Sequence, residues 1–127
     1  MKQLLPLFFA LFLLLSGCSG NGSDGSYQSI TQEEAKDLMD TQEVIVLDVR
    51  EQDEYDSGHI PGAVLLPVGT INEDTAAAVI PEKDTSVLVY CRSGNRSKAA
   101  SSALAELGYT NIYEFGGINT WPYDIEP

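Results

Sequence analysis

Hydrophobic residues along the chain fall into short blocks of two kinds, separated by polar sequence. Continuous apolar runs rich in β-branched residues are typical of buried parallel strands, and they predict strands at 44–47, 63–66, 87–90 and 112–115. Apolar positions at helical spacing predict helices or helical turns at 31–39, 51–56, 71–80 and 97–107. Strands that alternate with helices indicate an α/β fold with a mainly parallel central sheet of about four to five strands, flanked by helices.

Local signals mark the ends of several of these helices. Thr31 followed by Glu34 matches a capping box, in which the threonine caps the helix and the glutamate reaches back to it. Ser97 is a natural N-cap for the helix that follows it, and Gly108 supplies that helix with a C-terminal stop. The helix over 97–107 has the strongest apolar repeat in the chain.

The first residues are typical of a targeting segment and are not expected to be part of the folded domain. The apolar stretch 4–15 is shorter than the about 20 residues that span a bilayer, but it suits the hydrophobic region of a secretory signal. Its end, LSGC, resembles the lipobox of bacterial lipoproteins, which implies cleavage after Gly17 and a lipid on Cys18. We therefore expect residues 1–17 to be a lipoprotein signal peptide. An uncleaved anchor, or a plain signal followed by a chance cysteine, is the alternative.

Residues 18–26 contain glycine, serine and a few other polar residues, and they predict a flexible tether that starts at lipidated Cys18. The globular domain is then 27–127. We expect the protein to lie outside the cytoplasm, held by its lipid at the periplasmic face of a bacterial membrane or at the cell surface. No amphipathic face argues for a dimer, so a monomer is expected.

The charge balance is acidic, with 7 lysines and arginines against 19 aspartates and glutamates. Nucleic-acid binding is therefore excluded, because phosphate contacts need a basic face. Lys2 belongs to the predicted signal peptide. Of the six cations that remain, three stand close together just after Cys91: Arg92, Arg96 and Lys98. Such a cluster in an acidic protein predicts a site for a small anion.

Cys91 has no disulfide partner if Cys18 carries a lipid, because the chain has only 2 cysteines. It stands where a buried strand ends and a glycine-containing loop leads into a helix, and backbone amides at such a junction form an anion cradle. The helix dipole and nearby arginines favour the thiolate. A buried cysteine that serves only packing is the alternative; its surroundings favour a nucleophile.

Two motifs resemble single-domain rhodanese-like sulfurtransferases: CRSGNRS at 91–97 and LDVREQDEYDSGHIPGA at 47–63. The resemblance implies a rhodanese-like fold and a catalytic Cys91 that cycles between thiolate and persulfide. It implies a loop that binds an anionic sulfur donor such as thiosulfate, formed by Arg92, Ser93, Gly94, Asn95, Arg96 and Ser97. Arg96 is expected to contribute most among the side chains. Cyanide or a thiol would accept the sulfur, and no metal or organic cofactor is implied.

The other motif residues are expected to support the site. Asp48 and Arg50 leave a buried strand, where they would form hydrogen bonds or an ion pair, with Glu54 as the expected partner of Arg50. His59 could act as a base, but in a Gly-His-Ile-Pro-Gly loop a structural role is favoured. Trp121 and Tyr123 are expected to pack on the sheet rather than to line the pocket.

Two further functions remain open. Cys91 could hold sulfur for a partner with little turnover, as a carrier or binding module. A phosphatase or arsenate reductase of the related fold is disfavoured, because those loops place five residues between cysteine and arginine. Here four residues separate Cys91 from Arg96, and the loop lacks an acidic residue to act as general acid.

Overall fold

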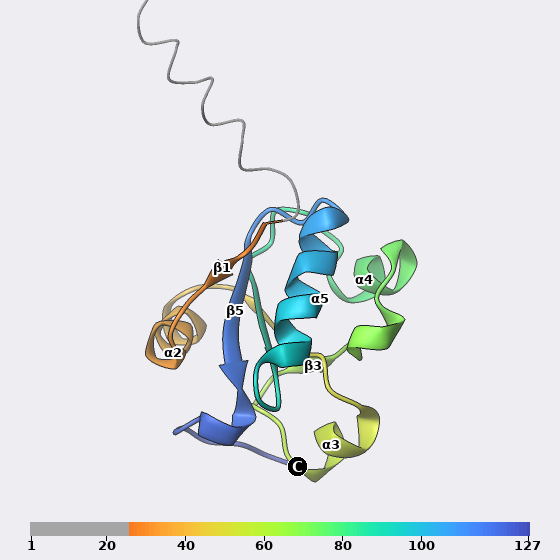
Figure 1. Ribbon diagram of the computed structural model, residues 1–127. Helices are drawn as coiled ribbons and strands as arrows, with labels where there is room; N and C mark the ends of the chain where they lie inside the picture. The colour runs from red at the N-terminus through yellow and green to blue at the C-terminus, as the bar shows by residue number, and fades with distance from the viewer. Residues whose placement is uncertain (1–25) are drawn as a thin grey trace, which may run out of the picture.

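The structure of the protein, a computed structural model, describes residues 26–127. Its centre is a sheet of five parallel strands in the order β1-β5-β4-β2-β3 (Figure 1). The strands are β1 (Gln28–Ser29), β2 (Ile45–Asp48), β3 (Val64–Leu65), β4 (Val87–Cys91) and β5 (Ile112–Gly117). The predicted α/β class and the parallel sheet are confirmed. The two-residue strand β1 was not predicted, since two exposed polar residues carry no hydrophobic signal.

Helices cover both faces of the sheet, and short helical turns complete the connections (Figure 1). They are α2 (Gln32–Thr41), α3 (Gln52–Ser57), η3 (Val68–Thr70), α4 (Glu73–Val79), α5 (Asn95–Glu106) and η4 (Ile118–Thr120). The predicted capping box of α2 is present, with Thr31 Oγ1 accepting from the Glu34 amide and the Glu34 carboxylate accepting from the Thr31 amide. The turns η3 and η4 contain three residues each, which is too short for a helical repeat to predict them.

Two hydrophobic cores lie on opposite faces of the sheet. One packs α4 and α5 against β2 and β4, through residues that include Ala76, Ala100, Leu104, Leu47 and Val89. The other packs α2 and the C-terminal turn against the opposite face, through residues that include Ala35, Val46, Leu88, Phe115 and Trp121. Both cores share β4, whose five residues are all buried. A strand buried on both faces needs a continuous apolar run, and Val87–Cys91 supplies it.

The centre of the sheet places Cys91 at the carboxyl end of a central strand. β4 lies between β2 and β5, pairing Asp48 with Tyr90 on one side and Cys91 with Gly117 on the other. The register between β4 and β5 shifts between Val89 and Cys91, so the strand ends irregularly just where the loop begins. In parallel α/β sheets, ligands bind at this edge of the sheet.

One predicted boundary is wrong in a way that matters for the site. We expected the helix after Cys91 to begin behind an N-cap at Ser97; α5 instead begins at Asn95, behind Gly94. Gly94 adopts a left-handed conformation with φ 113° that favours glycine. Ser97 is therefore inside the first helical turn, and its hydroxyl points to buried groups instead of capping the helix.

The predicted signal peptide (1–17) and the lipid site at Cys18 lie outside the described residues, as does all of the tether except Ser26. Within residues 26–127, no helix combines the length and apolar character needed to cross a membrane. The C-terminus lies beside α3 (Figure 1), where Glu126 and His59 exchange two backbone hydrogen bonds of 2.7 and 2.8 Å.

Candidate active site

The thiol of Cys91 lies beneath the loop that joins β4 to α5, and the residue is only 1% exposed. Its Sγ accepts a hydrogen bond from the Gly94 amide, with 3.0 Å between nitrogen and sulfur. Ser97 Oγ lies 3.5 Å from the same sulfur. The loop therefore curls around the sulfur atom, as expected from the motif, and brings the helix N-terminus to it.

Close contact between β5 and the loop fixes the position of the loop. The Arg92 carbonyl accepts a hydrogen bond from the Asn119 amide at 3.1 Å. It also lies so near Gly117 that a Cβ there would be 2.0 Å from the Arg92 oxygen and 2.6 Å from the Ser93 nitrogen. Only a glycine fits this approach, although its φ of −142° is open to any residue. Gly117 thus contributes to the site by having no side chain.

Burial disfavours the charged thiolate form of Cys91, but hydrogen bonds to the sulfur favour this form. They come from the Ser97 side chain and from the backbone amides of Ser97, Gly94 and Ser93, and together they hold the pKa of the Cys91 thiol below its ordinary value. Cys91 is the one free cysteine in residues 26–127. A buried thiol that is surrounded by donors is suited to act as a nucleophile.

A carboxylate that sequence analysis did not select lies next to this thiol. Glu114 of β5 is buried, with 3% exposure, and its Oε2 accepts from Ser97 Oγ at 2.5 Å and from the Gly116 amide at 2.9 Å. Sequence analysis placed Glu114 in the predicted strand at 112–115 and gave it no role. Only the position of α5 reveals that it faces the loop.

Arg96 is held by an acidic residue from the upstream motif. Its two terminal nitrogens donate to the two carboxylate oxygens of Glu54 at 2.8 and 3.0 Å, which is bidentate geometry. The hydrogen bond from Arg96 is the main cause that lowers the pKa of Glu54 to about 2. The charge of Arg96 is therefore compensated within the protein, and its guanidinium connects α5 to α3.

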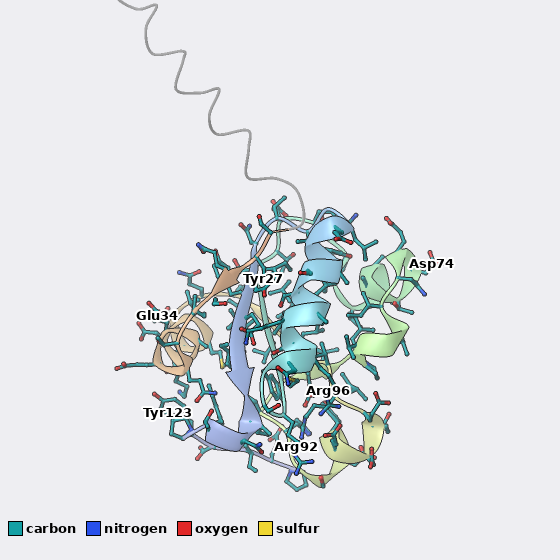
Figure 2. The ribbon with its side chains drawn as sticks, in the orientation of Figure 1. Tyr27, Glu34, Asp74, Arg92, Arg96 and Tyr123 are labelled. Atoms are coloured by element: carbon teal, nitrogen blue, oxygen red, sulfur yellow. The ribbon has the colours of Figure 1, made fainter. Side chains whose placement is uncertain are left out.

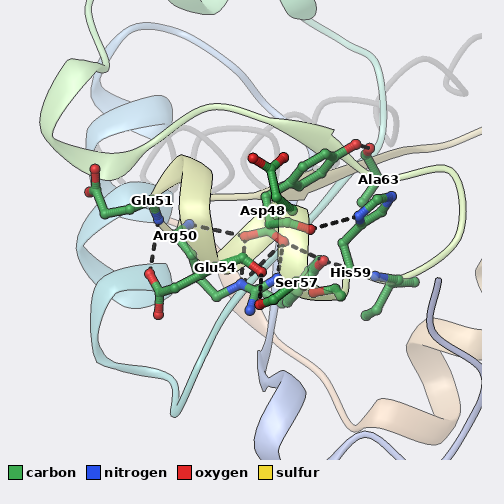
Figure 3. Close-up of polar contacts among 12 residues, drawn as sticks. Asp48, Arg50, Glu51, Glu54, Ser57, His59 and Ala63 are labelled. Atoms are coloured by element: carbon green, nitrogen blue, oxygen red, sulfur yellow. Dashed lines mark hydrogen bonds and ion pairs between the residues drawn. The ribbon is translucent and has the colours of Figure 1, made fainter. Parts of the chain in front are cut away.

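The expected pairing of Arg50 with Glu54 is wrong. Arg50 turns back to Asp48, two residues earlier, with Nη2 2.7 Å from Oδ2 and Nε 2.9 Å from Oδ1 (Figure 3). Asp48 is fully buried at the end of β2, so its charge needs a partner nearby, whereas Glu54 faces α5. Arg50 also donates to the Gly58 carbonyl at 2.7 Å and so supports the loop before His59.

The Asp48 carboxylate extends this network to the residue before the nucleophile. Tyr90 Oη donates to Asp48 Oδ2 at 2.6 Å and accepts from the Ile60 amide at 3.1 Å. Burial and the Asp48 hydrogen bond raise the pKa of Tyr90, which keeps the hydroxyl neutral. The motif residues expected to support the site thus fix β2, β4 and the 58–60 loop relative to one another.

His59 belongs to this supporting structure and does not reach Cys91. Its ring stacks on Tyr55 at 3.8 Å between centroids, and its Nδ1 lies 3.0 Å from the Tyr55 carbonyl (Figure 3). Its Nε2 lies 3.6 Å from a Glu126 carboxylate oxygen. Trp121 is buried against Phe115, and Tyr123 contacts Trp121 edge-on, so both pack at the C-terminal turn.

Three polar side chains of the loop remain at the surface: Arg92, Ser93 and Asn95. Figure 2 shows Arg92 and Arg96 at the same end of the molecule, below the N-terminus of α5. Within residues 26–127, Arg92 forms no ion pair, in contrast to Arg96. The available positive charge at the mouth of the loop therefore belongs to Arg92 and to exposed Lys98.

Comparison with known proteins identifies the family to which this arrangement belongs. The family model described as Rhodanese-like domain matches residues 31–122. The chain belongs to the rhodanese-like family. It is 34% identical over 96 residues to the thiosulfate sulfurtransferase GlpE of Coxiella burnetii, which covers 75% of this chain and 87% of that protein. The chain is thus a rhodanese-type sulfurtransferase, and the resemblance seen in its two motifs is confirmed.

Other relatives agree with this assignment. The thiosulfate sulfurtransferase PspE of Escherichia coli is 39% identical over 72 residues, or 57% of this chain and 68% of PspE. Among solved structures, a rhodanese with anions from E. coli aligns with TM-score 0.62 and 30% identity, over 66% of this chain and 98% of that one. A rhodanese-related protein from Thermoplasma volcanium aligns with TM-score 0.65 and 32% identity, over 79% and 98%.

Proposed function

We propose that this rhodanese-like enzyme moves sulfane sulfur from thiosulfate, or a similar anionic donor, to cyanide or a thiol through a persulfide on Cys91. The observation that carries the proposal is the loop around Cys91, in which the thiol is buried under backbone amides at a helix N-terminus. Relatives are named thiosulfate sulfurtransferases. One structural relative is described with anions.

The geometry of the loop supports this proposed chemistry. The Cys91 thiolate attacks the outer sulfur of thiosulfate; a sulfur–sulfur bond forms to Cys91 while the bond to the sulfonate sulfur breaks, and sulfite leaves with the electron pair. The amides of Ser93, Gly94 and Ser97 are placed to stabilise charge on the bound sulfur. The acceptor then attacks the outer sulfur of the persulfide and regenerates the thiolate.

Arg92 is the side chain best placed to attract the donor. It is exposed, follows Cys91 directly, and has no ion-pair partner in residues 26–127, whereas the charge of Arg96 is compensated by Glu54. An uncompensated cation at the mouth of an anion site raises the local concentration of an anionic substrate. We therefore propose that Arg92 recruits the donor and that Arg96 mainly holds the loop in place.

Two measurements test this function on the chain from Ser19 onward. Wild-type protein should convert thiosulfate and cyanide to thiocyanate, and intact mass should increase by one sulfur atom after treatment with thiosulfate alone. Cys91→Ser should show neither. Mass gain without thiocyanate formation would assign a sulfur carrier instead of an enzyme, and the absence of both in the wild type would disprove the persulfide.

We also propose that the enzyme acts outside the cytoplasm, held at a bacterial membrane by a lipid on Cys18. The support is the sequence of the first 26 residues, with a short apolar stretch, the LSGC ending and a polar tether. Cells that express the full chain with a clickable palmitate analogue should label the protein in the membrane fraction. Cys18→Ser should abolish the label, and Cys91→Ser should retain it.

A further inference from the structure

Glu114 is a buried carboxylate with no cationic partner among the described residues. Its carboxylate accepts hydrogen bonds from the Ser97 hydroxyl at 2.5 Å and from the Gly116 amide at 2.9 Å. It is 3% exposed, and no ion pair within residues 26–127 includes it. A buried carboxylate without a cationic partner depends on its hydrogen bonds, and those of Glu114 lead to the loop around Cys91.

A continuous line of hydrogen bonds connects this carboxylate with the nucleophile. The Cys91 thiol donates to Ser97 Oγ over 3.5 Å, and Ser97 Oγ–H donates to Glu114 Oε2 over 2.5 Å. The Gly94 carbonyl, 3.0 Å from Ser97 Oγ, and the Gly116 carbonyl, 3.3 Å from it, are longer alternative acceptors. A serine hydroxyl has one hydrogen, so while Ser97 donates to Glu114 it can only accept from Cys91.

We propose that Glu114 is a positioning residue that shares one proton with Cys91 through Ser97, so that the thiolate forms as Glu114 becomes neutral. This inference rests on Cys91 being the nucleophile of the proposed function. In the step, the thiol proton passes to Ser97 Oγ while the original Ser97 hydrogen passes to Glu114 Oε2. Cys91 becomes a thiolate, Ser97 remains a neutral hydroxyl, and Glu114 becomes a neutral carboxylic acid.

The transfer keeps every hydrogen bond in the line and reverses its direction. Afterwards the carboxylic acid of Glu114 donates to Ser97, and Ser97 donates to the Cys91 sulfur, which then has a side-chain donor in addition to its backbone amides. One negative charge moves from Glu114 to Cys91, and none is created in the buried site. Two anions on either side of one hydroxyl would repel each other, so the pair shares a single proton.

Few other charges face this pair. From α5, Arg96 acts on Cys91 electrostatically but is paired with Glu54, and Lys98 Nζ would lie 3.6 Å from a Cβ at Gly94. The neighbours of Glu114 in the adjacent strands are Ser29 of β1 and Val89 of β4, which carry no charge. Ser97 is therefore the main group that determines how the proton is divided between Cys91 and Glu114.

The pH dependence of Cys91 alkylation tests this inference without any sulfur transfer. The full chain is held in detergent, iodoacetamide is added at a series of pH values, and peptide mass spectrometry quantifies label on Cys91 alone. Because a coupled pair loses its two protons in two macroscopic steps, the wild-type rate should rise in two phases with a plateau between them. Glu114→Gln retains an acceptor for Ser97 but cannot take a proton, so it should show one phase.

The direction of the change distinguishes the possible roles. If Glu114 and Cys91 share the proton, Glu114→Gln speeds alkylation in the pH range of the wild-type plateau, because Cys91 no longer ionises beside an anionic carboxylate, and leaves the fully alkaline rate unchanged. A Glu114→Gln profile that coincides with that of wild type would mean that no proton is shared. Equal slowing at every pH would mean a structural role. Either result overturns the inference.

Two further variants complete the test. Ser97→Ala should also abolish the plateau, and adding Glu114→Gln in the S97A background should change the profile no further. Glu106→Gln removes an exposed charge from the end of α5 and should keep both phases. Loss of thiocyanate formation with an intact two-phase profile in the wild type would count against the proposed function alone.

Discussion

Arg96 and Glu54 lie 42 positions apart in the chain and form a bidentate ion pair, with 2.8 and 3.0 Å between nitrogen and oxygen atoms. The pair joins the first turn of α5 to α3, so it connects the two sequence motifs that identify the family. Arg96 is only partly buried, and its charge is within reach of Cys91. Because Glu54 compensates this charge, Glu54 determines whether Arg96 attracts the anionic substrate or only stabilises the structure.

Removing the charge of Glu54 should therefore strengthen anion binding. Glu54→Gln keeps an acceptor for the Glu51 amide but leaves the Arg96 cation uncompensated near Cys91. We expect the KM for thiosulfate to fall about two- to fivefold, as for a partly exposed charge worth about 0.5–1 kcal/mol. Steady-state thiocyanate assays measure it, and Glu33→Gln, an exposed charge on α2, is the control. An unchanged KM would show that the charge of Arg96 does not contribute to binding of the anionic donor.

The same pair predicts how stability depends on pH. The pKa of Glu54 in the folded protein is about 2, below its ordinary value of 4.5, so the folded state binds its proton less readily than the unfolded state. The contribution of the pair to stability is present above the ordinary value and is lost as the pH falls from 4.5 toward 2. Solvent exposure limits it to about 1 kcal/mol. Urea unfolding across this range should show a flatter profile for Glu54→Gln than for wild type; parallel profiles would contradict the assignment.

Gly117 should be sensitive to the smallest substitution. In Gly117→Ala the new Cβ would lie 2.0 Å from the Arg92 carbonyl oxygen, so the loop that carries Cys91 must move. We expect a loss of about 1–3 kcal/mol in unfolding free energy, as for an overpacked site, and a larger proportional loss of thiocyanate formation. Gly69→Ala is the matched control, because a Cβ at Gly69 meets nothing within 4 Å. Equal behaviour of the two variants would rule out the close approach as a constraint.

The sequence predicted the fold and the nucleophile because both depend on local patterns. A fully apolar run predicts a buried strand wherever it lies in the chain. The motif CRSGNRS indicates the loop around Cys91 because it resembles the motif of the rhodanese-like family. Partners across the sheet were not predictable in this way. Arg50 was expected to pair with Glu54, but it pairs with Asp48, which is fully buried and needs a compensating charge. Glu114 was missed because its role depends on where α5 packs over β5.

Arg92 should govern donor affinity without affecting the fold. It is exposed and makes no ion pair in residues 26–127, so Arg92→Ala should leave the unfolding free energy within about 0.5 kcal/mol of wild type. The KM for thiosulfate should rise several-fold, while kcat changes less, since the charge acts mainly on recruitment of the anion. Arg92→Lys keeps the charge and should restore most of the affinity. A fall in kcat at constant KM would instead place Arg92 in the chemical step.

Tyr90 connects the nucleophile's strand to the supporting network, and deleting one oxygen tests that connection. In Tyr90→Phe, Asp48 loses a 2.6 Å hydrogen bond and the buried Ile60 amide loses its acceptor. A buried donor left without a partner costs about 1–3 kcal/mol, and urea unfolding measures the loss. Tyr113→Phe is the control, because the Tyr113 hydroxyl has no hydrogen-bond partner among the described residues. Since Arg50 still neutralises Asp48, thiocyanate formation per folded molecule should persist in Tyr90→Phe; its complete loss would mean that the network acts on the chemistry of Cys91 and not only on the fold.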